Sequence, residues 1–415
     1  MLACLRACLP PLPGQDVRCG TGHCVHCQFR PPASTDMTQH QNEHLWQLKG
    51  NTASTSQLPP VFTMTGSSGT ADQVLHIRDT FSETTIVDET SHLRALLTHP
   101  WRPCDPTAFV KCCVLPGCHG LSLVAQTALQ PGDLIIRERP LYSVARHLVT
   151  NPGVFDKELH ERALASLTPL ARYKLNHLHN ACPPACDAFF GIIETNGLPV
   201  NLSAATESHL LTSHNHVALF PTIARANHSC CPNATYTFRA DTFAGELVAR
   251  KHIAAGEEIR IDYLDDPFMP QSQRSLTLRE RYAFVCTCLR CCRSPLDIMT
   301  SDRRRGFLKL FIESYHPASQ TDDRTLLETA LEYAEAEGLL RIYANLLLLE
   351  FRRVYRSGQW TQAVLRGRQA CDALILLDGS ENAAVRRLHH VSTVWHQDEL
   401  GVSRLPTRQP VVQVV

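Results

Sequence analysis

The sequence lacks an excess of charge of either sign, since 40 basic side chains stand against 40 acidic ones in 415 residues. No basic field therefore covers the chain, which disfavours a general nucleic-acid binder. It also lacks any apolar run near the ~18 residues that a membrane helix requires, so no integral membrane protein is expected. The opening MLACLRACLPPLPG is too short in its apolar part, and too interrupted by proline, for a secretory signal peptide.

Cysteine is abundant instead. Eighteen cysteines occur, and many fall in tight groups rather than at the intervals of a disulfide framework. Without a secretory signal, such groups indicate reduced thiols and metal ligation. We therefore expect an intracellular protein, in the nucleus, the cytoplasm or both.

The first part of the chain has little pattern. Residues 1–70 are rich in Pro, Ser, Thr, Gln and Gly and show no sustained period, so they are expected to be disordered. Cys19, Cys24 and Cys27 within them are either half of a zinc site or a solvated thiol cluster; the missing second ligand pair favours the latter. Residues 71–107 form a transitional segment with one expected helix at about 91–98.

The middle of the chain, residues 108–265, is expected to be a β-rich domain with a helical insertion at 141–186. Short β-branched and aliphatic stretches alternate with turns such as Pro131-Gly132-Asp133, which is typical of strands. Residues 156–180 carry leucines at helical spacing. The stretch FFGIIETNGLPV after them is predicted to return to strand structure.

Only helices are predicted after a cysteine-rich region at 266–294. Four amphipathic stretches at 305–315, 325–337, 339–355 and 359–377 are separated by glycines. They define a helical C-terminal domain at 295–380, followed by a tail at 381–415. One unit, GQWTQAVLRGRQACDALILLDG, resembles a tetratricopeptide helix pair. The fold class expected for the whole chain is α+β.

Three cysteines near residue 290 have the plainest chemistry. Cys286, Cys288 and Cys291 lie within six residues of one another and suit one tetrahedral zinc ion, which then needs a fourth ligand. Cys230 or Cys231 is available upstream, and Cys292 is available locally. Spacing alone leaves these three alternatives open.

Three segments in a fixed order carry a family resemblance: NHSCCPN at 227–233, GEEIRIDY at 256–263 and the C-x-C-x2-C trio. Together they resemble SET-domain protein-lysine methyltransferases, and more closely the SET and MYND-domain branch. The upstream GCHGLSLVAQTALQPGDLIIRERPL is similar to that family's first SET segment. The MYND zinc module of that branch has no counterpart in this sequence.

The resemblance implies roles for individual residues. It implies a catalytic tyrosine at Tyr263 and a zinc ion held by Cys230, Cys286, Cys288 and Cys291. It implies that S-adenosylmethionine contacts His119, Gly120, Asn196, Asn227, His228, Tyr263 and Phe284. It implies a lysine channel walled by Phe189, Tyr263 and Tyr282.

The function implied is methyl transfer from S-adenosylmethionine to a lysine ε-amine in a protein, either a histone tail or a non-histone protein. The alternative is a catalytically silent SET-fold interaction module with a structural zinc. In both cases the helical C-terminal domain is expected to bind protein partners. No direct contact with nucleic acid or membrane is expected.

Overall fold

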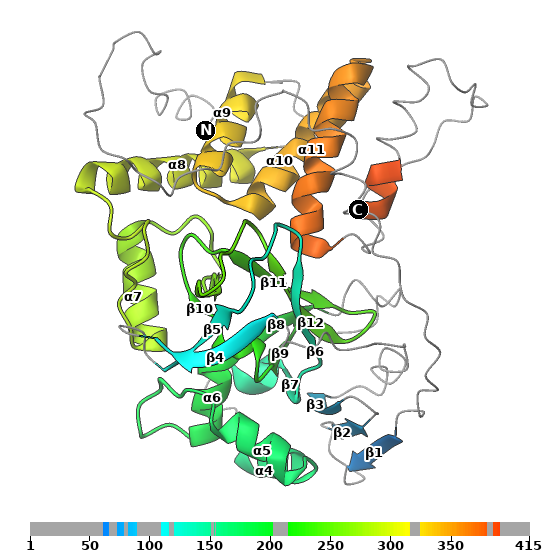
Figure 1. The fold of residues 1–415 in the computed structure, drawn as a ribbon, viewed down its shortest axis with the longest axis vertical. Helices are drawn as coiled ribbons and strands as arrows, with labels where there is room; N and C mark the ends of the chain where they lie inside the picture. The colour runs from blue at the N-terminus through cyan, green and yellow to red at the C-terminus, as the bar shows by residue number, and fades with distance from the viewer. Residues whose placement is uncertain are drawn as a thin grey trace, which may run out of the picture.

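The computed structural model describes residues 61–65, 73–78, 82–88, 109–115, 120–150, 153, 155–201, 215–315, 324–379 and 385–390. These residues build a β-rich body that carries a helical insertion at one end and a group of long helices at the other (Figure 1). The Cys19–Cys27 cluster, the helix predicted at 91–98 and most of the 381–415 tail lie outside the described residues. No helix among the described residues is both long and apolar enough to cross a membrane.

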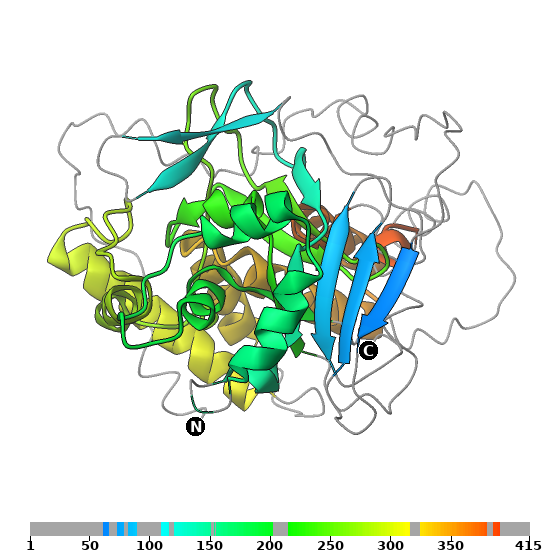
Figure 2. The same cartoon turned by 90° about the horizontal axis from the view of Figure 1, so that it is seen from below.

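The largest sheet has six strands in the order β1-β2-β3-β7-β9-β8. The hairpins β1 (Val61–Thr65), β2 (Gln73–Arg78) and β3 (Glu83–Asp88) are antiparallel, and they form one edge of the body in Figure 2. β3 then pairs in parallel with β7 (Tyr142–Ala145), which is followed in the sheet by β9 (Asn215–Leu219) and β8 (Leu198–Asn201). The sequence reading missed β1, β2 and β3, which lie at the end of the predicted disordered segment and inside the transitional one.

Three smaller sheets surround the apolar core of the body. They pair β4 (Val110–Val114) with β5 (Leu121–Ala125), join β11 (Ala234–Arg239), β12 (Ala244–Ala249) and β6 (Leu134–Glu138), and pair β10 (Asn227–His228) with β13 (Arg260–Ile261). The buried cluster between them includes Leu123, Ile135, Phe220, Phe243 and Leu247. Burial of these side chains stabilises the strands that carry the NHSCCPN and GEEIRIDY motifs.

The insertion predicted at 141–186 begins with strand β7, and its helical part is divided. Residues 156–180 form two helices, α4 (Lys157–Ala165) and α5 (Pro169–Asn176), because the Thr168 hydroxyl caps α5 and Pro169 occupies its first turn. A 3-10 turn, η2 (Arg146–Val149), precedes them. The α4 and α5 helices bury Leu159, Ala163 and Leu175 against the six-stranded sheet.

The prediction of strand structure for FFGIIETNGLPV is wrong over most of its length. Residues Ala188–Asn196 form helix α6, and only the last residues enter β8. The Asp187 carboxylate accepts hydrogen bonds from the backbone N–H groups of Phe189 and Phe190, which starts the helix. Because both faces of α6 are buried, its apolar run has no helical period to read.

The helical C-terminal domain follows the predicted order. After α7 (Gln271–Tyr282) come α8 (Pro295–Ser314), α9 (Arg324–Ala336), α10 (Leu340–Arg356) and α11 (Trp360–Asp378). The α8 helix packs on α9, α9 on α10 and α10 on α11. Two long-range hydrogen bonds fasten this layer to the β body, from Arg250 Nη2 to Gly338 O at 2.9 Å and from Arg239 Nη1 to Asp378 O at 3.1 Å.

Candidate active site and cysteine cluster

The NHSCCPN and GEEIRIDY motifs meet as two parallel strands. Asn227 pairs with Arg260 and His228 pairs with Ile261, so β10 lies directly beside β13. The Ser229 N–H then donates to Ile261 O at 2.9 Å, which extends the pairing by one residue. Tyr263 comes immediately after β13 and is therefore brought next to His228, with the two ring centroids 5.4 Å apart.

His228 lies between the backbone of Tyr263 and the cysteine cluster. Its side chain is fully buried. Nδ1 accepts a hydrogen bond from the Tyr263 N–H at 3.1 Å, which assigns the imidazole proton to Nε2. Nε2 lies 3.3 Å from Cys230 Sγ and points at that thiol. Burial lowers the pKa of His228 to about 4, so the ring is neutral at pH 7.

Both ring nitrogens of His228 have partners within the protein, so the imidazole links the backbone of Tyr263 to Cys230, a candidate zinc ligand. That His228 contacts S-adenosylmethionine stays a prediction.

Asn227 is held by the strand that follows Gly120. Its Nδ2 donates to Ser122 Oγ and to Glu258 Oε1, both at 2.8 Å. Gly120 itself has a φ of +85°, and no atom lies within 4 Å of the position that a Cβ would occupy. A left-handed conformation with open space beside it suits close approach of a ligand to the backbone. His119 lies outside the described residues.

The Tyr263 hydroxyl donates a hydrogen bond to Ala226 O at 2.8 Å. Burial raises the pKa of Tyr263 above its usual value, so the phenol stays protonated. Since its proton is committed to Ala226, the oxygen lone pairs remain available to accept. The Tyr282 ring lies 5.0 Å from the Tyr263 ring, and the Tyr282 hydroxyl lies 3.5 Å from Tyr263 O.

A cavity of about 480 Å³ opens beside these two tyrosines. Its walls come from the end of α6, from β8, β11 and β13, from the end of α7, and from the turn between α9 and α10. Residues from these walls include Asn196, Tyr236, Tyr263, Tyr282, Arg250 and Leu340. The cavity therefore lies between the β body and the helical C-terminal domain.

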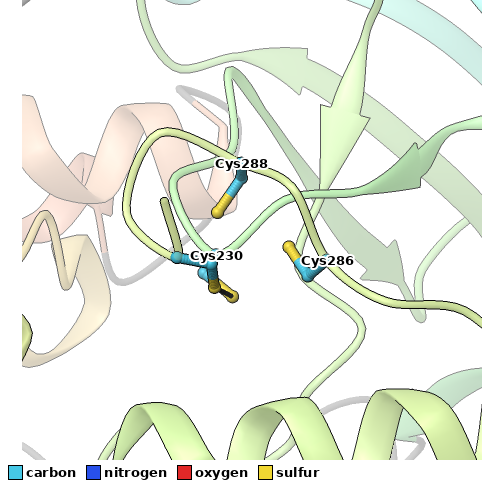
Figure 3. Close-up of side chains that lie close together, drawn as sticks. Cys230, Cys286 and Cys288 are labelled. Carbon is cyan, nitrogen blue, oxygen red and sulfur yellow. Dashed lines mark hydrogen bonds between the residues drawn. The ribbon is translucent and has the colours of Figure 1, made fainter. Parts of the chain in front are cut away.

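The four cysteines chosen from the family resemblance converge on one point. The Sγ atoms of Cys230, Cys286, Cys288 and Cys291 all lie within 4.8 Å of one another, and the Cys230–Cys291 separation is 3.6 Å. In a tetrahedral zinc site with Zn–S bonds of about 2.3 Å, sulfur atoms are about 3.8 Å apart. The set therefore fits zinc. Figure 3 shows Cys230, Cys286 and Cys288 directing their sulfurs toward one another.

The two alternative ligands take other positions. Cys231 Sγ lies 3.5 Å from Ser229 Oγ, beside the cluster. Cys292 is exposed. The geometry therefore favours Cys230 over both alternatives that spacing had left open.

Three further predicted residues fall in different places. Phe284 lies near the His228 ring, with centroids 6.0 Å apart. Asn196 lines the cavity, and its Nδ2 donates to His179 O at 2.6 Å and to Ile192 O at 2.8 Å. Phe189 is not brought to the described cavity lining. It is 8% exposed and packs edge-on against Tyr142, 5.1 Å between centroids, in the core of the insertion.

Several cavity residues were missed by sequence reasoning. Tyr236 stands three residues after the end of the NHSCCPN motif, and its hydroxyl donates to Pro199 O at 3.1 Å. Its aromatic character so near the motif was a usable signal. No sequence signal marked Arg250, Gly338 or Leu340, because long-range packing alone brings them to the cavity.

Comparison with known proteins agrees with this arrangement. The family profile described as SET domain matches residues 120–264. N-lysine methyltransferase SMYD2-B of Xenopus laevis is 32% identical over 142 residues, 34% of this chain and 31% of that protein. Over 205 residues, SMYD2-B of Danio rerio is 29% identical, covering 49% of this chain and 42% of that protein. Histone-lysine N-methyltransferase SMYD3 of Mus musculus is 38% identical over 90 residues, 21% of this chain and 20% of that protein.

Among solved structures, the SET domain of LSMT bound to lysine and AdoHcy aligns with 76% of this chain and 92% of that chain. Its identity is 12% and its TM-score is 0.25, a similarity too weak to carry any argument. The chain spans 31% and 42% of the lengths of the two SMYD2-B relatives it matches. Residues 120–264 match the SET domain, and parts of the chain are similar to SMYD2 and SMYD3, which are lysine methyltransferases.

Proposed function

We propose that this protein transfers a methyl group from S-adenosylmethionine to the ε-amine of a lysine in a protein substrate. The observation that carries the proposal is the position of Tyr263. Its hydroxyl is fixed by Ala226 O at the wall of a cavity, and its backbone is bonded to His228 on the strand that also holds Asn227.

The cavity beside Tyr263 and Tyr282 suits the side chain of the substrate lysine. Methyl transfer needs a neutral amine, and an enclosed apolar site lowers a lysine pKa by penalising the charged form. The rings of Tyr263 and Tyr282 lie side by side at the wall and exclude water from the entering side chain. The Tyr263 oxygen accepts an N–H hydrogen of the amine and so turns the amine lone pair toward the incoming methyl group.

The surroundings of Asn227 suit the methyl donor. When bound, S-adenosylmethionine supplies a methyl group on a sulfonium, a cation attracted to aromatic faces. The rings of Phe284 and Tyr263 both lie within 6.0 Å of His228, centroid to centroid, next to Asn227. Gly120 leaves open space at the start of β5, the strand that carries Ser122 to Asn227. These residues would hold the donor.

The cysteine cluster has a structural role in this proposal. A zinc ion held by Cys230, Cys286, Cys288 and Cys291 would pin the segment after α7 to the NHSCCPN motif. Through His228, the same ligand Cys230 also fixes the backbone of Tyr263. Thiolate ligands require a reducing compartment, so we place the protein in the nucleus or cytoplasm.

Labelled methyl transfer tests the proposal. Purified protein is incubated with a methyl-labelled donor and a cell extract, and the labelled proteins are hydrolysed to identify the modified amino acid. We expect methyl-lysine, in histones or in other proteins, and about 10²-fold less label, or lower still, with Tyr263→Phe. Donor binding without any transfer to lysine would instead indicate the alternative, a silent SET-fold interaction module.

A further inference from the structure

Glu258 is a buried carboxylate beside Asn227 that has no assigned role. It is 7% exposed and lies just before β13. A bridge to Val124 and the hydrogen bond from Ile259 N to Leu123 O fix this segment against β5. Three elements therefore converge on Glu258: β5 with Ser122, β10 with Asn227 and the segment that leads into β13.

The hydrogen bond between Asn227 and Glu258 can have only one direction. An ionised carboxylate only accepts hydrogen bonds, so the group that faces Glu258 Oε1 at 2.8 Å is the Asn227 amide NH₂. The same NH₂ reaches Ser122 Oγ at 2.8 Å. Both amide hydrogens are therefore directed into the protein, and the carbonyl oxygen of Asn227 is left as the atom available to a ligand.

Arg260 keeps Glu258 ionised and in place. Arg260 Nε donates to Glu258 Oε2 at 2.6 Å, and Nη2 lies 2.5 Å from the same oxygen. Burial alone raises the pKa of Glu258, but hydrogen bonds from Asn227 and Arg260 outweigh it and lower the pKa below its usual value. Arg260 holds one carboxylate oxygen, and the other faces Asn227; the Ser122 hydroxyl also hydrogen-bonds the carboxylate.

We propose that Glu258 is a positioning residue for methyl-donor binding: it locks the Asn227 carboxamide with its carbonyl oxygen facing the donor's ammonium group. This inference rests on the proposed function. Without Glu258 the amide is free to turn over and to present its NH₂, a donor, to a group that also donates. Glu258 acts through Asn227 and touches no substrate.

A double-mutant cycle read by calorimetry tests the proposal, with S-adenosylhomocysteine as the probe. Glu258→Gln should weaken binding about tenfold, the scale expected for loss of one charge-assisted hydrogen bond. In an Asn227→Ala background the same change should have almost no further effect, because its target is gone. A merely structural Glu258 would instead weaken binding equally in both backgrounds, and that result would overturn the inference.

The neighbouring Glu257 provides a matched control. Its carboxylate accepts from Asn233 Nδ2 at 3.1 Å and from Ala254 N at 3.0 Å and does not contact Asn227. Glu257→Gln should therefore bind the probe like the wild type, with unchanged zinc content.

A gentler variant keeps the test decisive if Glu258→Gln fails to fold. Ser122→Ala removes the other acceptor of the same amide, and with it a hydrogen bond to Glu258, without changing any charge. Because both losses act on the Asn227 amide, the change should weaken binding severalfold only when Asn227 is present. Binding that stays within twofold of wild type in both Glu258→Gln and Ser122→Ala contradicts the positioning role. If the wild-type protein itself does not bind the probe, the proposed function fails, and the role of Glu258 fails with it.

Discussion

Arg290 and Glu337 form a buried ion pair between the cysteine-rich loop and the helical C-terminal domain. The Glu337 side chain is fully buried, and Arg290 donates through Nη1 to its Oε2 and through Nη2 to its backbone oxygen at 2.9 Å. Ser301 Oγ and Arg305 Nε reach the same Oε2 at 2.6 Å and 3.1 Å. Since Arg290 lies between Cys288 and Cys291, this carboxylate joins the cysteine cluster to α8 and to the turn that follows α9.

Glu337→Gln should therefore destabilise the junction. The change leaves Arg290 and Arg305 buried without their counter-charge, and breaking one side of a buried pair costs about 3 kcal/mol or more. We expect a lower midpoint in chemical denaturation followed by circular dichroism. Glu332 is an exposed carboxylate on α9, the helix that precedes Glu337, and Glu332→Gln is the control that should leave the midpoint unchanged. Equal midpoints for both variants would show that the buried cluster adds no stability.

The cysteine cluster should bind about one zinc ion per chain. Cys288→Ser should release the metal and loosen the segment after α7, because the four ligands converge only in the folded state. Metal analysis of purified variants provides the measurement. Cys231→Ser should retain zinc and Cys230→Ser should lose it. Zinc loss in Cys231→Ser with zinc retained in Cys230→Ser would show that Cys231, not Cys230, is the ligand.

The protein should become less stable as the pH is lowered, because of His160. This imidazole is buried at 2% exposure, is bonded through Nδ1 to the Tyr142 hydroxyl and stacks on Phe155 with centroids 4.2 Å apart. Its Nε2 has no hydrogen-bond partner among the described residues. Burial lowers the pKa of His160 to about 4, although Asp156 and Asp187 nearby act to raise it.

The sign follows from proton linkage. Between pH 6.5 and about 4 the unfolded chain binds a proton at this position and the folded chain does not, so acid favours unfolding there. The free energy of unfolding should fall by up to about 1.4 kcal/mol per pH unit in that window. We therefore expect His160→Gln to reduce the slope of the unfolding free energy against pH, measured by chemical denaturation, by up to this amount. A slope that is the same in both proteins would mean that His160 is protonated in the folded state.

Local sequence predicted which segments belong to the candidate site, because each motif consists of residues close together in the chain. The NHSCCPN motif places Asn227 and His228 on a strand paired with β13, and Tyr263 lies two residues beyond the end of β13. Periodicity predicted the bounds of α9, α10 and α11 closely, but the helix predicted at 305–315 begins at Pro295. Neither motifs nor periodicity predict contacts between segments that are far apart in the sequence. The Glu337 partners are 32 to 47 residues away in sequence, and no pattern in either segment indicates the pairing.

The secondary structure was predicted wrongly, or missed, in segments whose apolar residues show no helical or strand period. Helix α6 is buried on both faces, so its apolar run predicted a strand, and Phe189 was assigned to a channel when it packs in the insertion core. β3 holds its place through pairing with β7, about 57 residues downstream, and through Glu83, which accepts from the Thr168 N–H at 3.1 Å. The place of β3 in the sheet depends on distant partners that a single sequence does not reveal.

The most direct test of the account is the split between binding and turnover in Tyr263→Phe. The variant keeps the ring at the cavity wall and removes only the hydroxyl that is bonded to Ala226 O. Methyl transfer should fall about 10²-fold or more, on the order of 3 kcal/mol in the transition state, while calorimetry shows unchanged affinity for S-adenosylhomocysteine. Methyl transfer at the wild-type rate in Tyr263→Phe would contradict the assignment of this tyrosine as the catalytic residue.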